Sequence, residues 1–269
     1  ARADRLLHVD SGDCFQGAPI FNLNLGEVEF KFLTEAGLDA AVVGNHEFDA
    51  GARNFAEMAR DHAGFYLLAA NYEWMDPKQL NSNKGGQYTA PYSIHNVQGV
   101  KVGVIGMANL SSLNSIVEGG NSLQVTPYEQ NEAARKYVEF LKPVVDLVVV
   151  VTHLGLHEDQ DLVRGYEAFY EYGKAKEHLR WSAGGPTFEC DRTLPAGSQQ
   201  GCENKPAGAW EIREWFGTSD RTNENIDRSV VKVFIPGVSG IDIVFGGHLH
   251  VVLNPPQKLA DPSGRDVLL

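Results

Sequence analysis

Short apolar runs that end beside glycine are the clearest pattern along the chain. Residues 241–245 read Ile-Asp-Ile-Val-Phe, and Gly-Gly-His-Leu-His follows directly at 246–250. A short apolar run that glycines terminate is typical of a buried strand. The two imidazoles that follow share one side if the backbone stays extended. The same pattern predicts strands at 6–10, 40–43 and 147–151, and each leads into a polar loop.

Amphipathic stretches alternate with these strands and predict helices over 26–36 and 52–62. In each stretch, apolar residues recur at the spacing that places them on one helical face. A third helix is predicted to begin at Thr126-Pro127, as cap and first helical residue, and to run to about residue 141. The apolar positions expected to share a face are Val28, Phe32 and Leu33 in the first helix and Phe55, Met58 and Ala59 in the second.

Further strands are predicted at 65–69 and, as a hairpin, at 92–97 and 100–106. The alternation of strands and helices predicts an α/β fold with mostly buried strands. The chain of 269 residues is long enough for one large domain, and its hydrophobic content of 43% is that of a globular protein. No apolar run approaches the ~20 residues that a membrane-spanning helix needs.

Residues 157–230 break this rhythm. A charged helix is predicted over 158–179, a loop-like stretch over 181–209 and a short helix over 210–216. A loop-rich stretch of this length is uncommon inside an α/β domain and is usually functional. We therefore interpret 157–230 as an insertion between the strands that precede His153 and His248, and not as a second domain.

The charge of the chain limits its partners. A formal net charge of −12 argues against a surface that binds DNA or RNA. A small anionic substrate is still compatible with that charge, because bound divalent cations dominate the local field of a site.

Polar residues that can bind a metal ion follow four of the predicted strands. Asp13, Asn45, His153, His248 and His250 lie at strand exits, where α/β sheets build their sites. Carboxylate, amide and imidazole groups together suit hard or borderline divalent ions. Alone, Asp13 or Asn45 would be interpreted as a turn former and His153 as structural, but the five together predict a metal centre. Asp13 is the candidate to bridge two ions, because a carboxylate offers two oxygens.

His46 is expected to do chemistry, because it follows Asn45 and should point away from that ligand's direction. A cationic imidazole could stabilise a transferring phosphoryl group or protonate the leaving oxygen. Asp49 could hold this imidazole in one tautomer. Its alternative role is to cap a helix that begins near Ala50, and the two roles are compatible. Asp10 is expected to orient the loop that follows it.

The three cysteines receive separate interpretations. Cys190 and Cys202 lie in a Gly/Pro/Ser-rich stretch, where a disulfide would staple a loop and imply an oxidising compartment. The alternative is two unpaired loop thiols. Cys14 could be a soft metal ligand, but a small buried residue is favoured because no second cysteine lies near it.

Four motifs in a fixed order give the chain a resemblance to a known family. They resemble the ordered motifs of the calcineurin-like metallophosphoesterases. Residues 12–17, 44–49 and 69–72 are similar to the 5'-nucleotidase branch, which includes periplasmic and surface 5'-nucleotidases and 2',3'-cyclic phosphodiesterases. The resemblance covers the chain except 157–230. The four motifs are Ser11-Gly12-Asp13, Gly44-Asn45-His46-Glu47, Thr152-His153-Leu154-Gly155 and Gly246-Gly247-His248-Leu249-His250.

The resemblance implies a four-layer αββα sandwich around a dinuclear centre. Two divalent metal ions are implied, and Zn, Mn, Fe and Co all fit the ligand set. By the family pattern Asp13 bridges the two ions. Asn45, His153 and His248 complete one ion, and His250 reaches the other.

His46 with Asp49 matches the family's catalytic dyad. The implied activity is hydrolysis of phosphoric esters, with nucleotides as the expected substrates and a periplasmic or extracellular location. Two family features have no match in the sequence: a first strand carrying Asp-x-His, and a C-terminal domain that grips the base in 5'-nucleotidases. We expect 1–269 to be a catalytic domain that lacks both. The rival hypotheses are a thiosulfohydrolase on the same scaffold and a metal-binding remnant without activity.

Overall fold

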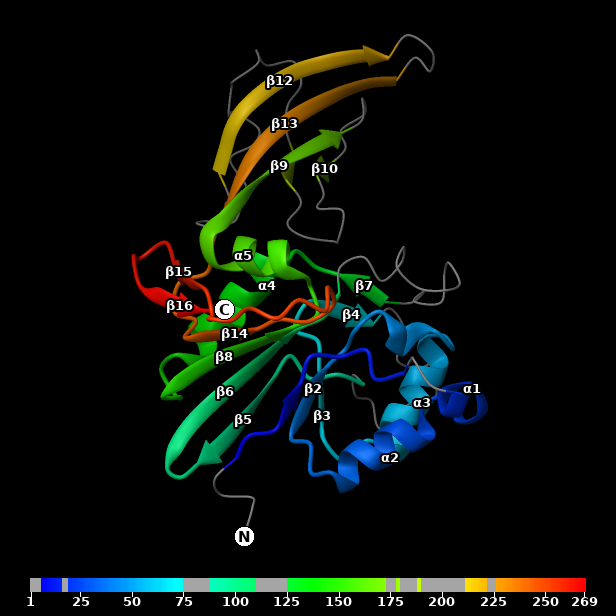
Figure 1. Ribbon diagram of the computed structural model, residues 1–269. Coiled ribbons are helices and arrows are strands. Elements are labelled where there is room, and N and C mark those ends of the chain that lie inside the picture. Colours follow the sequence, from blue (N-terminus) through cyan, green and yellow to red (C-terminus); the bar gives the residue numbers. More distant parts are fainter. Residues whose placement is uncertain are drawn as a thin grey trace.

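The computed structural model describes residues 6–15, 19–74, 88–109, 125–172, 178–179, 188–189, 211–221 and 226–269. Two sheets form its centre (Figure 1). The smaller sheet is parallel and has the order β1-β2-β3. Its strands are β1 (Val9–Asp10), β2 (Ala40–Val42) and β3 (Tyr66–Leu68).

The larger sheet has six strands in the order β15-β16-β14-β8-β6-β5. Strands β6, β8 and β14 are parallel neighbours, and β5 and β6 form the predicted hairpin. Strand β16 pairs in parallel with β14 and in antiparallel fashion with β15. The strands are β5 (Tyr92–Val97), β6 (Val100–Met107), β8 (Leu147–Thr152), β14 (Ile243–Phe245), β15 (Lys258–Ala260) and β16 (Asp266–Leu268).

Helices cover the outer face of each sheet (Figure 1). Strand β8 shows the layering, because successive side chains of a strand point to opposite faces. Val149 and Val151 belong to the core that the two sheets share, whereas Val148 and Val150 pack in the core beneath α4 and α5. The predicted four-layer αββα sandwich is confirmed. The helices are α1 (Pro19–Asn24), α2 (Glu27–Glu35), α3 (Ala52–His62), α4 (Gln130–Leu141) and α5 (Leu156–Arg164).

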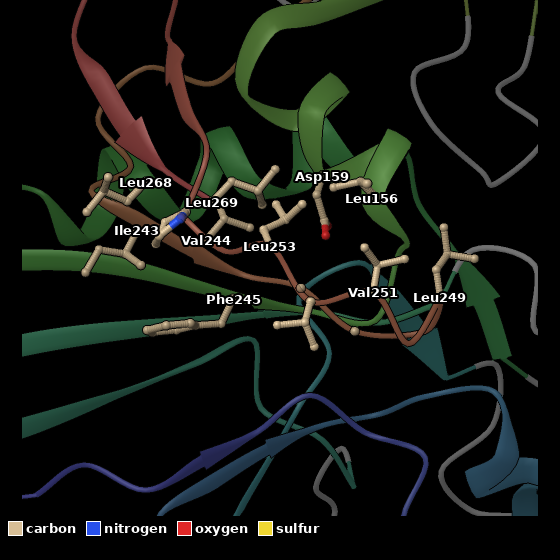
Figure 2. Close-up of a pocket in the computed structure, with 14 residues that line it drawn as sticks. Leu156, Asp159, Ile243, Val244, Phe245, Leu249, Val251, Leu253, Leu268 and Leu269 are labelled. Atoms are coloured by element: carbon tan, nitrogen blue, oxygen red, sulfur yellow. The ribbon is translucent and has the colours of Figure 1, made fainter.

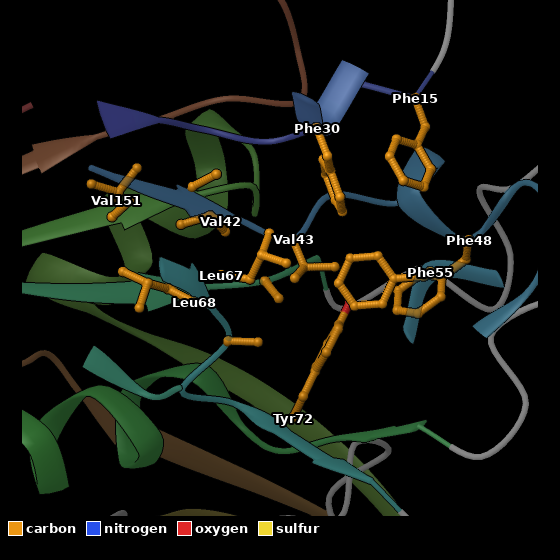
Figure 3. Close-up of a cluster of buried hydrophobic side chains, with 14 of the residues drawn as sticks. Phe15, Phe30, Val42, Val43, Phe48, Phe55, Leu67, Leu68, Tyr72 and Val151 are labelled. Atoms are coloured by element: carbon orange, nitrogen blue, oxygen red, sulfur yellow. The ribbon is translucent and has the colours of Figure 1, made fainter. Parts of the chain in front are cut away.

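A cluster of phenylalanines anchors the loops that leave β1 and β2 (Figure 3). Phe15, Phe30, Phe48 and Phe55 are fully buried. The ring centroids of Phe15 and Phe30 lie 4.8 Å apart, and those of Phe48 and Phe55 lie 5.6 Å apart. Such pairs add to the free energy gained from apolar burial. Phe15 and Phe48 therefore fix the ends of the two loops that carry candidate ligands.

The predicted helices over 26–36 and 52–62 are confirmed, but the buried face of the first was wrong. Phe32 is 68% exposed, whereas Phe30 is fully buried. Two positions along a helix turn the side chain by about 200°, so only one of these rings can face the core. Phe30 takes that place because it contacts the other buried aromatic rings.

The predicted start of the third helix was also wrong. Thr126 and Pro127 lie in strand β7 (Val125–Pro127), which pairs with β4 (Tyr72–Trp74). Helix α4 begins at Gln130, and the Glu129 carboxylate caps it by accepting the backbone N–H groups of the second and third helical residues at 2.9 and 2.6 Å. The Glu129 side chain thus satisfies two of the N–H groups that the start of a helix leaves without an intrahelical partner.

The stretch 157–230 differs most from expectation. Helix α5 ends at Arg164, and β9 (Gly165–Tyr172) follows instead of further helix. The short helix predicted at 210–216 lies in strand β12 (Glu211–Arg221). With β13 (Ile226–Pro236) these strands form an antiparallel sheet in the order β12-β13-β9, beyond α5 in Figure 1. Aromatic and β-branched residues in β9 and β13 favour strands over helices.

Most of the loop predicted at 181–209 lies outside the described residues. The short strands β10 (His178–Leu179) and β11 (Phe188–Glu189) are described and pair in antiparallel fashion. In the described part of the chain, no helix combines the length and apolarity that crossing a membrane requires.

Candidate metal centre

The loop after β1 places Asp13 at the edge of the two sheets. Asp10 accepts the Gly12 backbone N–H at 2.8 Å, which confirms that it orients this loop. Gly12 has φ 95°, and a side-chain carbon there would lie 2.8 Å from the Val42 carbonyl oxygen and from the Gly44 nitrogen. The loops after β1 and β2 therefore touch backbone to backbone, which only glycine permits. Asp13 follows at φ 66°.

Three of the predicted ligands meet in one cluster. The ligand atoms of Asp13, His153 and His248 all lie within 4.8 Å of one another. His153 Nε2 is 2.9 Å from Asp13 Oδ2 and 3.2 Å from Asn45 Oδ1. The His153 and Asn45 side chains are buried, and the ring centroids of His153 and His248 are 5.1 Å apart. The ends of β1, β2, β8 and β14 thus bring together four of the five predicted ligands.

The chemistry of this cluster fits a cation. The carbonyl oxygen of Ser11 lies 2.6 Å from His153 Nδ1, and a carbonyl can only accept, so Nδ1 carries a proton. Nε2 then faces two oxygens, from Asp13 and Asn45, that are themselves acceptors. A proton or a metal ion at Nε2 resolves this conflict. A carbonyl on the far nitrogen is also how metal-binding histidines are commonly oriented.

Electrostatics at the cluster favour positive charge. Burial disfavours the cationic form of His153, but the hydrogen bond and charge of Asp13 outweigh it and raise the pKa of His153. Burial likewise opposes ionisation of Asp13, and the hydrogen bond and charge of His153 lower its pKa overall. The pKa of His248 is lowered, by burial first and then by the charge of His153, so its imidazole is held neutral, as a metal ligand must be.

His250 lies apart from the three-residue group. His248 has φ 71° and His250 has φ 55°, so the backbone here is not extended. The expectation that both rings share one side assumed an extended backbone and was therefore wrong. His250 is exposed, and its charge is among the causes that lower the pKa of His248. His250 is therefore a neighbour of the cluster, and its binding of an ion stays a prediction.

His46 and Asp49 form the expected pair at the end of β2. Their Nδ1 and Oδ2 atoms are 2.9 Å apart, and the Asp49 side chain is 5% exposed while that of His46 is 30% exposed. His46 is the first residue of a short 3-10 helix, η1 (His46–Phe48), and Asp49 is the residue that ends it. The His46 backbone N–H donates to Asp13 Oδ1 at 2.9 Å. The alternative for Asp49 was wrong, because Gly51 occupies the N-cap of α3.

Glu47 had no role predicted from the sequence, and the structure gives it a central one. Its carboxylate is buried and accepts three backbone N–H groups, from Gly44 at 2.5 Å, Asp13 at 3.0 Å and Cys14 at 2.7 Å. It therefore joins the loops after β1 and β2. Burial first, and then the charge of Asp13, raise the pKa of Glu47. The sequence offers one weak signal for this role. Glu47 stands between the strand predicted at 40–43 and the aromatic residue Phe48, so its charged side chain is placed among apolar neighbours.

Two asparagines fix the backbone around His153. Asn71, which also lacked a predicted role, donates to the Ala108 carbonyl at 2.9 Å and accepts the Ala108 N–H at 2.8 Å. Asn109 then donates to the carbonyl of His153 at 3.1 Å. Because both amides are buried, each satisfies backbone groups that water does not reach. His157, another histidine near this site in the sequence, is exposed.

Cys14 packs against the aromatic core, and its thiol is not part of a disulfide. Burial, followed by the charge of Glu47, raises the pKa of this thiol well above its usual value. A thiol that keeps its proton is a poor metal ligand, which supports the structural interpretation. Cys190 and Cys202 lie outside the described residues, so their disulfide stays a prediction.

Known proteins are similar to this chain in sequence and in fold. A snake venom 5'-nucleotidase from Gloydius brevicauda is 33% identical over 166 residues, which are 61% of this chain and 27% of that protein. The chain is thus similar in sequence to proteins named 5'-nucleotidase. In agreement, the crystal structure of a 5'-nucleotidase precursor from Thermus thermophilus matches 99% of this chain and 39% of its own, with a TM-score of 0.63 at 23% identity.

The chain spans about 27% of the length of the curated snake venom relative. No family model matches the chain. A sulfate thiohydrolase from Thermus thermophilus has the same fold over 93% of this chain and 31% of its own, with a TM-score of 0.56 at 15% identity. The resemblance to the 5'-nucleotidase branch is confirmed by the sequence relative, while the fold alone is common to both chemistries.

Proposed function

We propose that the protein is a metal-dependent hydrolase of phosphoric esters with nucleotides as its substrates. The observation that carries this proposal is the meeting of carboxylate, amide and imidazole acceptors at the ends of four strands, in Asp13, Asn45, His153 and His248. A buried group of acceptors favours a cation, and divalent ions with such ligands serve phosphoryl transfer. The sequence relative named 5'-nucleotidase supports a nucleotide as substrate.

In this proposal, Asp13, Asn45, His153 and His248 hold one divalent ion, and Asp13 with His250 contributes to a second. Zn, Mn, Fe and Co all fit these ligands. When bound, such ions supply a nucleophilic water and neutralise charge on the phosphoryl oxygens. The dinuclear arrangement rests on the family resemblance.

His46 is proposed to act on the phosphoryl group itself. Its Nδ1 is paired with Asp49, which leaves Nε2 as the nitrogen that meets a substrate. A protonated Nε2 can donate to a phosphoryl oxygen or to the leaving oxygen as negative charge develops there. Asp49 keeps the ring in the orientation that this donation needs. The backbone bond from His46 to Asp13 ties this group to the ligand loop.

We further propose that a strand carrying Asp-x-His lies beside β1 and completes the second ion's ligands. Within the described residues, β1 has a strand partner on one edge only, which is β2. An apolar groove of about 430 Å³ lies beside that strand. A groove of this kind suits the apolar face of a strand. Its lining residues are Leu7, Val9, Val97, Val100, Val102, Leu147, Val149 and Phe245.

The remaining parts of the proposal concern the complete protein. We propose that the nucleotide is gripped by a C-terminal domain of the same polypeptide, as the family resemblance implies. A periplasmic or extracellular location is proposed on the same ground. The predicted Cys190–Cys202 disulfide would agree with that location and can be checked by mass spectrometry of a non-reduced digest.

The test is metal-dependent release of phosphate from a nucleoside monophosphate by the full-length protein. Chelation should abolish turnover, and added Mn²⁺ or Co²⁺ should restore it. The variant Asp13→Asn should lose turnover at every metal concentration, because it loses one charge and one bridging oxygen. Unchanged turnover after complete chelation would overturn the proposal.

The second candidate function is hydrolysis of a thiosulfonate-type sulfur ester. We retain this candidate because the sulfate thiohydrolase from Thermus thermophilus has the same fold. An S-sulfonated thiol offered in parallel with a nucleoside monophosphate distinguishes the two, because the proposal predicts phosphate release and little sulfate release. Firm metal binding without turnover of either substrate would instead identify a metal-binding protein that has lost its activity.

A further inference from the structure

A buried carboxyl next to the candidate metal centre has no part in the proposed reaction. Asp159 lies in helix α5 and is 1% exposed. The Thr152 hydroxyl donates to its Oδ1 at 2.5 Å. Leu156 and Val251 lie beside this carboxyl in an apolar cavity of about 450 Å³ (Figure 2). A carboxyl in such a place costs free energy, so it calls for a structural or functional account.

The Asp159 carboxyl lies between the ends of two strands that carry candidate ligands. Thr152 is the last residue of β8 and directly precedes His153. Gly246 is the first residue after β14 and stands two residues before His248. A side-chain carbon on Gly246 would collide with Asp159 Oδ2, so the carboxyl fills the room that this glycine leaves.

The same carboxyl lies where pairing between the two strands stops. The parallel register of β8 and β14 ends with Val151 opposite Phe245. The next residues along the chain after this last pair are Thr152 and Gly246. Asp159 accepts a hydrogen bond from Thr152 and packs against Gly246. One carboxyl thus bridges the two strands beyond their last backbone pair. Helix α5, which contains Asp159, is anchored in the core by Leu162, which is fully buried.

We propose that Asp159 is a positioning residue that sets the separation of His153 and His248. The inference rests on the proposed metal site, because it concerns two of its ligands. Groups that bond directly to a ligand commonly change metal affinity by about 10–100-fold when they are removed. Asp159 bonds to the residue before one ligand, so an effect at the lower end of that range is expected. Asp159 acts through Thr152 and Gly246 and does not itself touch the ion or the substrate.

The test measures Co²⁺ affinity and the visible spectrum of bound Co²⁺ in the full-length protein. Asp159→Ala should weaken Co²⁺ binding by roughly tenfold or more and shift the spectrum, because the ligand separation changes. Asp159→Asn should keep affinity within about threefold, since its amide oxygen can still accept from Thr152. Thr152→Val should weaken binding in the same direction but by less, because Asp159 still packs against Gly246. The double variant should equal Asp159→Ala, because both substitutions remove the bond between Thr152 and Asp159.

Leu162→Ala is the matched control on the same helix. It removes a fully buried side chain and so lowers stability, but it leaves the Asp159 contact in place. Under conditions where it is folded, its Co²⁺ affinity and spectrum should equal those of the unsubstituted protein. Equal losses in Leu162→Ala and Asp159→Ala, or an unchanged spectrum in Asp159→Ala and Thr152→Val, would overturn the inference. If Asp159→Ala does not fold, Thr152→Val decides. Failure of the unsubstituted protein to bind Co²⁺ would refute the metal site and this role together.

Discussion

The two halves of the candidate metal centre come from different sheets and are held in different ways. In the half built by β1 and β2, Glu47 accepts three backbone N–H groups and joins the loops of Asp13 and Asn45. In the half built by β8 and β14, Asp159 accepts a hydroxyl from Thr152. Hydrogen bonds from backbone groups to a carboxylate are strong and fix the loop directly. In the first half one carboxylate therefore holds two loops through backbone groups, whereas the carboxylate of the second half holds the strand ends through one hydroxyl, beside the Asn109 bond to the carbonyl of His153.

The two carboxyls also differ in what opposes their burial. Burial raises the pKa of Asp159 to about 7, and the bond from Thr152 opposes it only in part. Burial and the charge of Asp13 raise the pKa of Glu47, but backbone donors at Asp13 and Gly44 act in the opposite direction. The half with Asp159 therefore contains a carboxyl whose pKa of about 7 makes its stability respond to pH near neutrality.

The largest effect is expected from Glu47→Ala. It leaves three backbone donors, at Gly44, Asp13 and Cys14, without their acceptor. At about 1–3 kcal/mol for each unsatisfied buried group, the free energy of unfolding should fall by roughly 3–9 kcal/mol. Urea unfolding measures the change. The control is Glu57→Ala, which removes an exposed pair with Arg53 and should cost about 1 kcal/mol or less. Similar losses in both variants would contradict the claim that Glu47 holds the first half.

A pH effect is expected from Asp159 in the second half. The folded pKa of Asp159, about 7, lies above its ordinary value of 3.8. Its contribution to stability is therefore fully present below about pH 4 and is lost as the pH rises through 7. The total loss approaches about 4 kcal/mol at about 1.4 kcal/mol for each pKa unit. The charge of Glu158 strengthens this shift, while the Thr152 hydroxyl and the charge of His153 weaken it.

Unfolding experiments across that pH range, on the unsubstituted protein and on Asp159→Asn, measure this effect. The amide cannot ionise, so the difference in free energy of unfolding between the two proteins should change by several kcal/mol between pH 4 and 8. If the free energies of unfolding of the two proteins ran parallel across this pH range, the pKa of Asp159 would not be raised, and this difference between the two carboxyls would be refuted.

A smaller effect, on catalysis alone, is expected from His46→Asn. His46 lies in the first half, pairs with Asp49 and is 30% exposed, so in the proposed reaction we expect its substitution to affect turnover more than folding. Turnover of a nucleoside monophosphate should fall by roughly 10²-fold or more, while metal content stays unchanged. Initial rates and metal analysis on the same preparation provide the measurement. Full activity in this variant would remove His46 from the proposed reaction.

The ligands could be predicted from the sequence because their signal is local. Each follows an apolar run within a few residues, and the carboxyl ends of neighbouring strands meet at one edge of a sheet. The supporting residues carry no such signal. Glu47 bonds to Asp13, 34 positions away, and Asn71 bonds to Ala108, 37 positions away. Pairings over such distances depend on the folded arrangement, which periodicity does not describe.

The errors in secondary structure have a similar cause. Phe30 and Phe32 are both apolar, and only the aromatic cluster decides which of them is buried. Thr126 and Pro127 have the composition of a helix start, but β4 lies alongside and pairs with them as a strand. The strands β9 and β13 pair with each other across more than fifty residues, so neither could be expected from its own neighbourhood.

The most direct test of the metal centre is anomalous diffraction at the zinc absorption edge from crystals grown with Zn²⁺. The account predicts a peak in contact with Asp13 Oδ2, His153 Nε2 and an imidazole nitrogen of His248, at about 2.0–2.2 Å from each atom. Asn45 Oδ1 should turn towards the same peak. A well-ordered cluster with no anomalous peak, in which His153 Nε2 instead donates a hydrogen bond to Asp13 Oδ2, would contradict the account.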